Sequence, residues 1–423
     1  MQEMKDSGIS WVGEIPKEWS VNRAKYCFVN TKEIAGCRSD RYERLALTMN
    51  GVIKRSKDDS NGLQPEKFET YQILRPDELV FKLIDLQNVS TSRVGLSPYL
   101  GLVSPAYIIL KSNKRVLPAF AEKYFLMLWK NQIFNALGDA GVRSNLNSKD
   151  LLELSIPFPP LAEQQRIAEF LDRECGKIDG LKADIQAQID TLEQYKRSVI
   201  TEAVTHGLNP SAPMKDSKVW YGQIPSEWKE LIGKYVFKQR NDRGNNVCLQ
   251  LLSPTQKYGV IPQDKYEELT GMNAVKLNDS TNYALLKTIH KGDYCISLRS
   301  FQGGFEYSEY EGVVSPAYQV FYPIITIADG YYKYLFKEKG FIDVMNSYTM
   351  SLRDGKNIAF DDFGDTFIPV PPLDEQQEIA DYLDNKCAEI EQIIADKKSQ
   401  IETLDGYKKS LIYEYVTGKK EVV

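Results

Sequence analysis

The chain is poor in the residues on which most metal centres and nucleophilic enzymes depend. Only two of its 423 residues are histidines, His206 and His290, which leaves little material for a metal site or for a nucleophile activated by a base. The six cysteines never stand two residues apart, so the spacing of a zinc ribbon or of a redox pair is missing. We therefore expect reduced thiols, no metal site, and surface or capping roles for both histidines.

Long apolar stretches are also lacking. No window approaches eighteen uncharged apolar residues, and the first ten residues, MQEMKDSGIS, hold no apolar core of a signal peptide. The composition, 42% hydrophobic and 26% charged, is that of an ordinary soluble protein, and 423 residues suggest two to four domains. We expect a cytoplasmic protein without a membrane span.

What the chain has instead is an internal repeat. PPLAEQQRIAEFLD at 159–172 returns as PPLDEQQEIADYLD at 371–384, with ten of fourteen positions identical at an offset of 212. WVGEIPKEW at 11–19 returns as WYGQIPSEW at 220–228, and GLVSPAY at 101–107 returns as GVVSPAY at 312–318. Identity at so constant an offset indicates a tandem duplication of a unit of roughly 210 residues.

A long charged segment follows PPLxEQQ in both copies. Its apolar residues fall on one side of a helical wheel, with Ile167, Leu181 and Ile189 beside a row spaced by sevens. That row consists of Leu171, Ile178, Ile185, Leu192 and Val199 in the first copy and of Leu383, Ile390, Leu404 and Leu411, interrupted by Lys397, in the second. Prolines before the segment and a glycine after it limit each helix to about 44 residues, or roughly 65 Å. A single helix cannot bury this apolar row by itself, so the row must face a partner helix. Antiparallel pairing of the helices of the two copies would give a rod with a globular domain at each end.

The rest of each copy is typical of a mixed α/β domain. Short β-rich runs at 79–84, 102–103, 107–110 and 294–298 indicate strands, and apolar spacing at 120–137 and 331–345 predicts helices. The expected fold class is α/β: two globular mixed α/β domains joined by two long antiparallel helices in a coiled coil, as a pseudo-two-fold tandem repeat. The expected boundaries are a first domain at 1–157, a central helix at 158–207, a second domain at 208–369, a C-terminal helix at 370–418 and a tail at 419–423.

The net charge of −5 is unevenly distributed. Residues 1–160 hold 22 Lys and Arg against 18 Asp and Glu, a net charge of +4, whereas the helical segments 161–210 and 373–423 carry −3 and −5. The first globular domain is therefore mildly basic, and the second, with −1 over 211–372, is nearly neutral. This balance allows contact with DNA through local patches, while the acidic helices suit docking to proteins.

Basic and amide side chains in loop-like stretches are the candidates for DNA contact. Arg paired with guanine, and Gln or Asn paired with adenine, are the usual side chains of major-groove readout. A solvated surface would explain any single cluster as well. The candidates are Lys54, Arg55, Lys82, Gln87, Asn88, Arg93, Arg143 and Asn145 in the first copy and Arg240, Arg243, Arg299, Ser300, Gln302 and Arg353 in the second.

The SPAY stretches at 104–107 and 315–318 look catalytic at first sight. Methyltransferases that act on the amino group of adenine carry Asp, Asn or Ser followed by two prolines and an aromatic residue, but the third residue here is Ala106 or Ala317. No convincing glycine-rich loop for S-adenosylmethionine and no GxxxxGK[ST] loop accompany the motif. We therefore interpret SPAY as a packing motif where a strand begins, and expect no catalytic residue.

Taken as a set, the repeated motifs resemble the specificity subunits of type I DNA restriction-modification systems. The similar stretches are WVGEIPKEW, SPAY, IPFPPLAEQQRIAEFLD with IPVPPLDEQQEIADYLD, and YKRSVITEAVTHG with YKKSLIYEYVTG. They cover both halves of the chain in the order of that family. The departures are Lys397 in the heptad row and the shortening of VTHG to VTG.

The resemblance implies two target-recognition domains, each reading one half of a bipartite site in double-stranded DNA. It implies that the paired helices act as a ruler for the unread spacer and dock two methyltransferase (modification) subunits. Those subunits bind S-adenosylmethionine and methylate adenine N6, and ATP-dependent restriction subunits translocate and cut the DNA. This chain would then bind no cofactor of its own and would be a non-catalytic subunit of the complex.

Two other functional classes stay open from the sequence. A coiled-coil adaptor would bind proteins and read no DNA, and a free-standing DNA-modifying enzyme would act with S-adenosylmethionine alone. The repeat makes one further structural prediction. Because the first residues of the chain repeat those that follow the first long helix, we expect the N-terminus to pack beside the end of the second one.

Overall fold

The computed structural model describes residues 3–59, 67–86, 93–113, 115–137, 145–218, 222–244, 249–272, 283–296, 304–348 and 358–422. They form two compact units: unit 1 comprises Met1–Gln186 and Lys398–Val423, and unit 2 comprises Ala187–Lys397. Each of the two long helices contributes one half to each unit. Within the described ranges, no helix combines the length and the apolar composition needed to cross a membrane.

Unit 1 contains two four-stranded sheets, with strand orders β6-β5-β10-β7 and β4-β11-β8-β9. Neighbours in both sheets are antiparallel except β10 and β5, where Leu102 pairs with Arg44 in parallel. Its strands are β1 (Met4–Asp6), β2 (Glu14–Pro16), β3 (Ser20–Arg23), β4 (Phe28–Asn30), β5 (Arg44–Thr48), β6 (Gly51–Arg55), β7 (Gln72–Leu74), β8 (Glu78–Lys82), β9 (Arg93–Leu96), β10 (Gly101–Val103), β11 (Ile108–Ser112) and β12 (Ser155–Phe158). Its helices are α1 (Pro118–Lys130), α2 (Ile133–Leu137), α3 (Ser148–Glu153) and the first half of α4 (Leu161–His206), joined by the last part of α9 (Leu373–Val416).

Unit 2 repeats this order of elements. Its four-stranded sheet, β16-β23-β20-β21, corresponds to β4-β11-β8-β9 of unit 1. A parallel bridge between Leu251 and Val313 links the strand pairs β17-β18 and β19-β22. It is the counterpart of the parallel pairing of Arg44 with Leu102 in unit 1. Its strands are β13 (Met214–Asp216), β14 (Gln223–Pro225), β15 (Lys229–Ile232), β16 (Phe237–Arg240), β17 (Leu252–Thr255), β18 (Gly259–Pro262), β19 (Lys287–Ile289), β20 (Tyr294–Ile296), β21 (Phe305–Tyr307), β22 (Gly312–Val314), β23 (Gln319–Pro323) and β24 (Phe367–Val370). Its helices are α5 (Gln263–Thr270), α6 (Asp329–Leu335), α7 (Lys339–Ser347), α8 (Phe360–Gly364) and the remaining halves of α4 and α9.

The predicted strands are confirmed as β8, β10, β11 and β20, but each predicted helix is in fact two helices. In unit 1, Gln132 adopts a φ of 58° and separates α1 from α2. In unit 2, α6 ends at Leu335, and α7 starts anew because the side chain of Glu338 accepts a hydrogen bond from the amide of Phe341 at 2.8 Å. Apolar periodicity continued across both breaks, so it could not reveal them.

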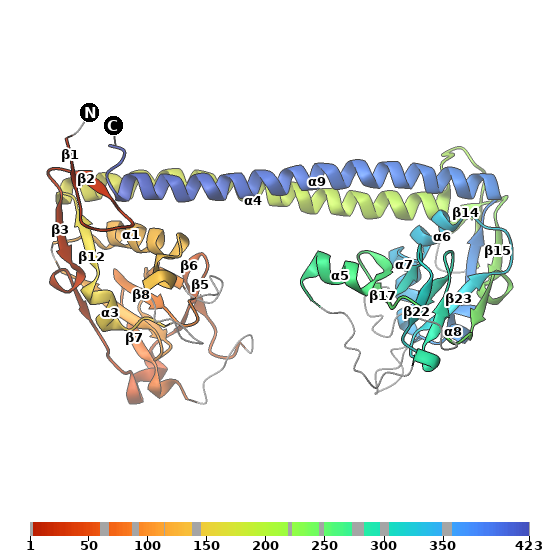
Figure 1. Cartoon of the computed structure of the whole chain (residues 1–423), viewed down its shortest axis with the longest axis horizontal. Coiled ribbons are helices and arrows are strands. Elements are labelled where there is room, and N and C mark those ends of the chain that lie inside the picture. Colours follow the sequence, from red (N-terminus) through yellow and green to blue (C-terminus); the bar gives the residue numbers. More distant parts are fainter. Residues whose placement is uncertain are drawn as a thin grey trace. The chain divides into compact units, whose positions relative to one another are not determined.

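The main core of each unit lies between its sheet, its short helices and its halves of α4 and α9. In unit 1 the ring of Phe125 on α1 meets Phe28 and Phe81 edge-on, and Leu171 and Leu411 from the long helices belong to the same buried cluster. Figure 1 shows α1 lying along the long helices with β8 beyond it. The long helices are therefore part of each globular core rather than appendages to it.

The repeated glutamate of PPLxEQQ fixes the start of each long helix. The indole Nε1 of Trp19, from WVGEIPKEW, donates to Glu163 Oε2 at 3.1 Å, and Trp228 donates to Glu375 at 2.8 Å in the second copy. Both indoles are buried. Two of the motifs that recur in the sequence are thus hydrogen-bonded to each other in both copies.

The glutamine after that glutamate joins the long helix to the neighbouring short one. Gln164 is 1% exposed; its Oε1 accepts from the amide of Leu117, the N-cap of α1, at 2.8 Å, and its Nε2 donates to Pro159 O at 2.9 Å. Gln376 repeats this arrangement with Ala328, the N-cap of α6, and with Pro371. Each buried amide is satisfied at both ends, which explains why neither copy has lost it.

Replacing Gln164 by leucine is expected to lower the free energy of unfolding of unit 1 by about 2 kcal/mol, because it leaves a buried N–H and a buried carbonyl without partners. The matched control is Gln165→Leu: Gln165 is exposed and donates to the exposed Glu169, so its loss should change stability by less than about 0.5 kcal/mol. Urea unfolding followed by circular dichroism measures both. Equal effects in the two variants would contradict the joining role of Gln164.

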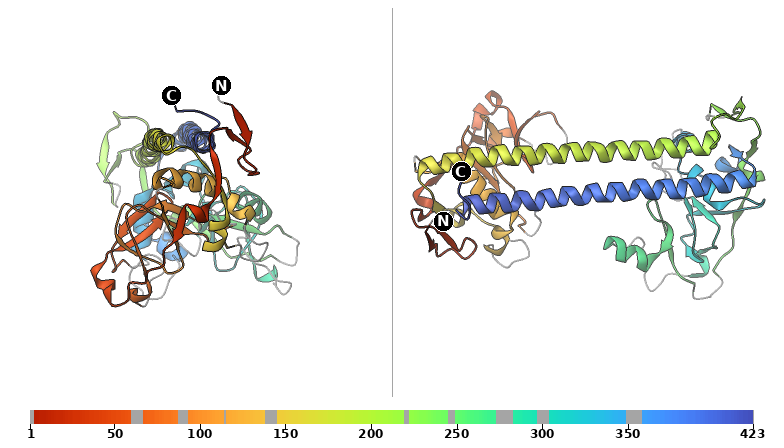
Figure 2. Two further views of the ribbon diagram at one scale, coloured as in Figure 1. Left: turned by 90° about the vertical axis from the view of Figure 1, so that its left-hand side faces the viewer. Right: turned by 90° about the horizontal axis from the view of Figure 1, so that it is seen from above.

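The predicted packing of the N-terminus beside the end of the second long helix is confirmed within unit 1. Tyr413 donates from its hydroxyl to Val12 O at 3.4 Å, and the ammonium of Lys419 donates to Glu14 O. Gly418 ends the helix with a φ of +71°, where a Cβ would meet Pro16 at 2.3 Å. The two chain ends accordingly lie close together in Figures 1 and 2.

Within each unit the halves of α4 and α9 run antiparallel and lie side by side (Figure 2). Lys408 bonds Asp179 at 2.7 Å and Lys182 bonds Asp405 at 2.5 Å in unit 1, so rising numbers on one helix meet falling numbers on the other. In unit 2, Lys196 pairs with Glu391. The pairs Lys408–Asp179 and Lys196–Glu391 occupy equivalent positions, because 196 and 391 correspond to 408 and 179 at the offset of 212.

The heptad row predicted from the sequence is buried or half-buried at each of its positions. Lys397, which interrupts the row, donates to Gln188 Oε1 at 2.5 Å across the pair. The placement of Leu181 on the buried side is wrong: its side chain is 53% exposed. Leu171, Ile178, Leu383, Ile390 and Leu411 are buried, and Ile185, Leu192, Val199 and Leu404 are half-buried.

Candidate nucleic-acid interface

A basic hollow lies on the β5-β6 hairpin of unit 1. It has a volume of about 440 Å³, and cationic side chains outnumber carboxylates in its wall by five to two. The cations are Arg41, Arg44, Lys54, Arg55 and Lys57, and the carboxylates are Asp40 and Glu43. Two of the predicted DNA contacts, Lys54 and Arg55, therefore lie in one concave, positively charged surface.

The cations of this hollow are held in place by their neighbours. Lys54 pairs with Glu43 at 2.6 Å and stands 5.4 Å from the ring of Tyr99, and the hydrogen bond to Glu43 raises the pKa of its ammonium. Arg55 pairs with Asp59 through Nε at 3.2 Å. Lys57 donates to Ser39 O at 2.9 Å. Three cations of this positive surface are thus held by neighbouring groups.

Arg41 is a candidate that the sequence reasoning missed. It lies at the end of a short 3-10 helix, is exposed and lines the hollow. The signal that could have found it is the density of arginines in RSDRYER at 38–44, three in seven residues.

Arginines from three different strands come together around Tyr107 of the first SPAY. Burial raises the pKa of the Tyr107 hydroxyl, and the charges of Arg93, Arg44 and Arg55 act in the opposite sense. Arg44 and Arg55 are cross-strand partners, and Arg93 donates to Leu47 O on the strand of Arg44. Two of them, Arg55 and Arg93, were predicted from the sequence as DNA contacts. The fold thus brings together positions that are separated by 38 residues in the chain.

The end of the β8-β9 hairpin carries the other described candidates of unit 1. Lys82 and Arg93 are cross-strand partners, and burial together with the charge of Arg93 lowers the pKa of the Lys82 ammonium. Arg93 Nη1 donates to Leu47 O at 3.2 Å, and Asn145 accepts from the amide of Asp85 at 3.1 Å. Gln87, Asn88 and Arg143 lie outside the described residues.

Unit 2 uses its predicted basic residues differently. Arg240 forms two hydrogen bonds with Asp293, at 2.7 and 3.1 Å, and lies 4.4 Å from the ring of Tyr322 on β23, so it connects β16 to the residue just before β20 across the strand between them. Arg243 is exposed and donates to Leu285 O at 2.6 Å. Arg299, Ser300, Gln302 and Arg353 lie outside the described residues.

The SPAY motif is a tight turn that joins two strands, which confirms its interpretation as a packing motif. In unit 1 the amide of Tyr107 donates to Ser104 O at 3.1 Å, and the buried side chain of Gln72 donates to the carbonyls of both residues, at 2.8 and 3.0 Å. In unit 2 the ammonium of Lys287 takes the place of this amide and donates to Tyr318 O at 2.7 Å. The motif carries backbone contacts in both copies.

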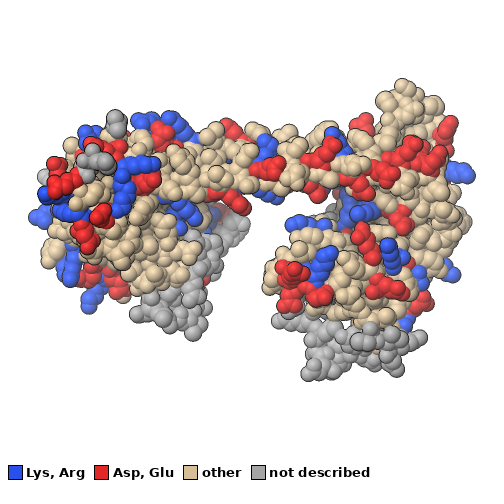
Figure 3. All heavy atoms as spheres, turned by 45° about the horizontal axis from the view of Figure 1, so that its top comes forward, with Lys and Arg blue, Asp and Glu red and all other residues tan. Residues whose placement is uncertain are grey.

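A second surface, on the long helices, repeats in both copies. Leu181 and Tyr407 of unit 1 are 53% and 58% exposed, and they lie at one level because the pairs Asp179–Lys408 and Lys182–Asp405 bracket them. Their counterparts at the offset of 212, Ile393 and Tyr195 of unit 2, are 45% and 49% exposed. Carboxylates are scattered along the visible face of the helices in Figure 3. Large apolar side chains are thus exposed at equivalent positions of both copies.

Nothing in the described part of the chain resembles a metal centre. No group of three or more His, Cys, Asp or Glu side chains with suitable placement occurs among those residues. Cys27, Cys37, Cys175, Cys295 and Cys387 are free thiols, and Cys248 lies outside the described ranges.

Residues 57–191 and 233–403 match the type I restriction modification DNA specificity domain. Over 97% of this chain and 96% of the other, the sequence is 23% identical to a protein of Methanocaldococcus jannaschii assigned as the MjaX specificity subunit of a type I restriction enzyme. The MjaVIII specificity subunit of the same organism is 27% identical over 36% of each chain.

A solved structure of a type I R-M system, described for its complex assembly and conformational transition, contains a chain with the same fold. Its TM-score is 0.66 at 14% sequence identity, and the match covers 96% of this chain and 99% of the other.

Proposed function

The chain belongs to the family defined by the type I restriction modification DNA specificity domain, and from this premise we propose that it is the DNA-specificity subunit of a type I restriction-modification complex. The observation that carries the proposal is the repeat itself. The hydrogen bonds from tryptophan to glutamate and from the helix N-caps to glutamine occur in both copies. The charged side chains beside the two SPAY turns, in contrast, differ between the copies. Two different readers on one scaffold suit a target with two unlike halves.

We assign the reading of the two half-sites to residues 1–157 and 208–369. In the first domain the proposed DNA surface comprises the basic hollow with Lys54 and Arg55, the predicted residues Lys82, Arg93 and Asn145, and Arg41. In the second, Arg243 belongs to the proposed surface, whereas the pairing of Arg240 with Asp293 suits a structural role. The proposed part of the long helices, 158–207 and 370–418, is to set the unread spacer between half-sites.

We further propose that the partners are double-stranded DNA, two modification subunits and ATP-dependent restriction subunits. Methyl transfer and cleavage would take place on those subunits in the cytoplasm, and this chain would supply specificity without a cofactor. Mapping N6-methyladenine across the genome, with and without this chain, tests the proposal. A split motif with two unlike halves should disappear when the chain is removed. An unchanged methylation pattern, with no retention of duplex DNA by the purified complex, would exclude it.

The two exposed apolar pairs on the helices are the proposed docking sites for the modification subunits, one site per unit. Replacing Leu181 and Tyr407 by serine should weaken one site at least about tenfold, because aromatic and large apolar side chains contribute most to such interfaces. Native mass spectrometry of the purified complex should then show one modification subunit in place of two. The variant Tyr195→Ser with Ile393→Ser should give the same stoichiometry through the other site.

The control for this experiment is Glu402→Ser, a change of an exposed residue on α9 outside both pairs, which should leave two subunits bound. Retention of two subunits by both serine double variants would show that docking uses another surface. Far-UV circular dichroism of each variant separates loss of docking from loss of the helices.

A further inference from the structure

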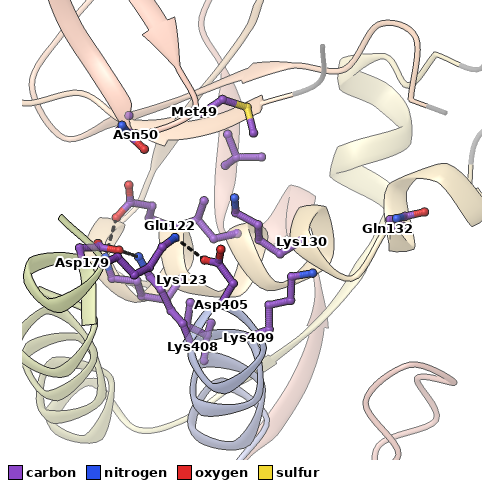
Figure 4. A pocket seen from close by; sticks show the side chains of 15 residues that line it. Met49, Asn50, Glu122, Lys123, Lys130, Gln132, Asp179, Asp405, Lys408 and Lys409 are labelled. Atoms are coloured by element: carbon purple, nitrogen blue, oxygen red, sulfur yellow. Dashed lines mark hydrogen bonds and ion pairs between the residues drawn. The ribbon is translucent and has the colours of Figure 1, made fainter. Parts of the chain in front are cut away.

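A large cavity in unit 1 shares no lining residue with the basic hollow, and neither Leu181 nor Tyr407 lines it. It has a volume of about 960 Å³, and its wall is formed by the β5-β6 turn, by α1 and by the halves of α4 and α9 that belong to unit 1 (Figure 4). That volume is enough for a ligand of the size of a nucleotide. No feature of the proposed DNA reading uses it.

The wall of this cavity carries more positive than negative charge. Five lysines and three carboxylates line it. Three of the lysines are compensated: Lys123 pairs with Glu122 at 3.1 Å, Lys182 with Asp405 at 2.5 Å, and Lys408 with Asp179 at 2.7 Å. The other two are Lys130 on α1 and Lys409 on α9, and neither forms an ion pair with a residue that the structure describes (Figure 4).

Lys130 lies close to an aromatic ring and to several of the other charges of this cavity. Its ammonium is half-buried and lies 4.2 Å from the ring of Trp129. Burial lowers the pKa of the Lys130 ammonium, and the positive charges of Lys408, Lys409 and Lys182 lower it further. The negative charge of Asp405 acts in the opposite direction. A multiply charged anion in the cavity would remove this repulsion between like charges.

Two uncharged amides complete the wall. Asn50 lies in the β5-β6 turn, and Gln132 lies in the break between α1 and α2 with a φ of 58°. Such a backbone conformation is rare outside glycine, and it places the side chain of Gln132 at the edge of the cavity (Figure 4). Amide N–H groups and ammonium groups are the donors that phosphate oxygens accept from.

The corresponding cavity of unit 2, about 590 Å³ in volume, is smaller and is lined differently. It keeps the pair Lys196–Glu391, but the counterpart of Lys182 at the offset of 212 is Ile394. Where Lys123 pairs with Asp172 at 2.6 Å, the hydroxyl of Tyr334 donates to Asp384. A buried carboxylate, Glu306, also lines its wall. Five lysines and four carboxylates line this cavity, so its excess of positive charge is smaller than that of the unit 1 cavity.

We propose that the cavity of unit 1 binds a small anion bearing two or more phosphates, such as inorganic pyrophosphate or the polyphosphate of a nucleotide, with Lys130 and Lys409 as its principal contacts. The charge and the volume of the cavity support this class of ligand over a single chloride or carboxylate. The proposal is independent of DNA reading, so either can fail without the other.

Isothermal titration of the full chain with pyrophosphate, and separately with ATP without metal, tests the site in low-salt buffer. Both ligands should bind the unaltered chain, and Lys130→Met with Lys409→Met should weaken both at least about tenfold, because each removes a charge-assisted contact. Methionine keeps the apolar stem of lysine, so the fold should be retained. A thermal melt without ligand verifies this.

The matched control is Arg197→Met, which removes the cation at the position of unit 2 that corresponds to Lys409 and should leave both affinities unchanged. Absence of pyrophosphate binding to the unaltered chain would overturn the proposal. So would affinities that the double variant leaves intact, or that Arg197→Met lowers equally. Binding of ATP without any binding of pyrophosphate would show recognition of the nucleoside and overturn the assignment to phosphate.

Discussion

Replacing Leu171 by aspartate is expected to destabilise unit 1 by more than about 4 kcal/mol, because the change combines a large-to-small core substitution with burial of a carboxylate. The Leu171 side chain is 0% exposed and lies in one buried cluster with residues of α1 and α9. A loss of this size approaches the whole stability of an ordinary domain. Urea unfolding should show unit 1 melting at much lower denaturant, and Leu383→Asp should do the same to unit 2, where Leu383 is also 0% exposed.

The control is the same chemical change ten residues along the helix. Leu181 is 53% exposed, so Leu181→Asp should alter the free energy of unfolding by less than about 0.5 kcal/mol while it weakens docking of the modification subunit. If the proposed ruler is correct, a chain with both Leu171→Asp and Leu383→Asp no longer fixes the spacer between half-sites. Normal stability of that chain would contradict the seam, and a normal methylation motif would contradict the ruler.

The framework shared by the two units could be predicted from the sequence because the residues that form its contacts occur in both copies. Trp19 and Glu163 recur as Trp228 and Glu375, so a comparison of the two copies marks all four positions. What the comparison could not supply was the pairing, since each tryptophan stands more than 140 residues from its glutamate. Only the fold shows that these repeated motifs are hydrogen-bond partners.

Side-chain placement on the helices was predictable only in part. A helical wheel distinguishes an apolar arc from a polar one, but Leu181 lies at the margin of that arc, one residue before Lys182, which pairs with Asp405 on the other helix. Burial there depends on what the neighbouring helix and sheet cover. The corresponding residue of the second copy, Ile393, is also apolar, so a comparison of the two copies could not show whether this position is buried or exposed.

The candidate DNA surface was the least predictable feature, because the two copies differ there and cannot check each other. Arg240 was predicted as a DNA contact from its place in a basic stretch, yet its principal partner, Asp293, lies 53 residues away. The gathering of Arg44, Arg55 and Arg93 around Tyr107 depends on the order of strands in two sheets. Residue type suggested these positions, and tertiary structure decided which of them meet.

Arg93 gives the sharpest test of half-site reading. If its guanidinium reads a guanine through two parallel hydrogen bonds, Arg93→Ala should weaken binding to the correct site by about 3 kcal/mol, roughly 100-fold. Affinity for a site altered only in the first half should change little, so discrimination in that half is lost. Recognition of the second half should stay intact, because it belongs to the other domain.

The variant Arg93→Lys separates base reading from contact with phosphate. Lysine keeps the charge but lacks the planar fork, so a base contact should be lost nearly as completely as in Arg93→Ala, whereas a phosphate contact should be largely preserved. Fluorescence anisotropy with duplexes altered in either half, at two salt concentrations, measures affinity, discrimination and salt dependence together. Arg23→Ala is the control, since Arg23 is exposed in unit 1 and paired with Glu153 at 2.6 Å, away from the proposed surface. Weakening that is uniform across all duplexes, with near-complete rescue by lysine, would instead assign Arg93 to the phosphate backbone and leave the reading of the first half-site to the other side chains of unit 1.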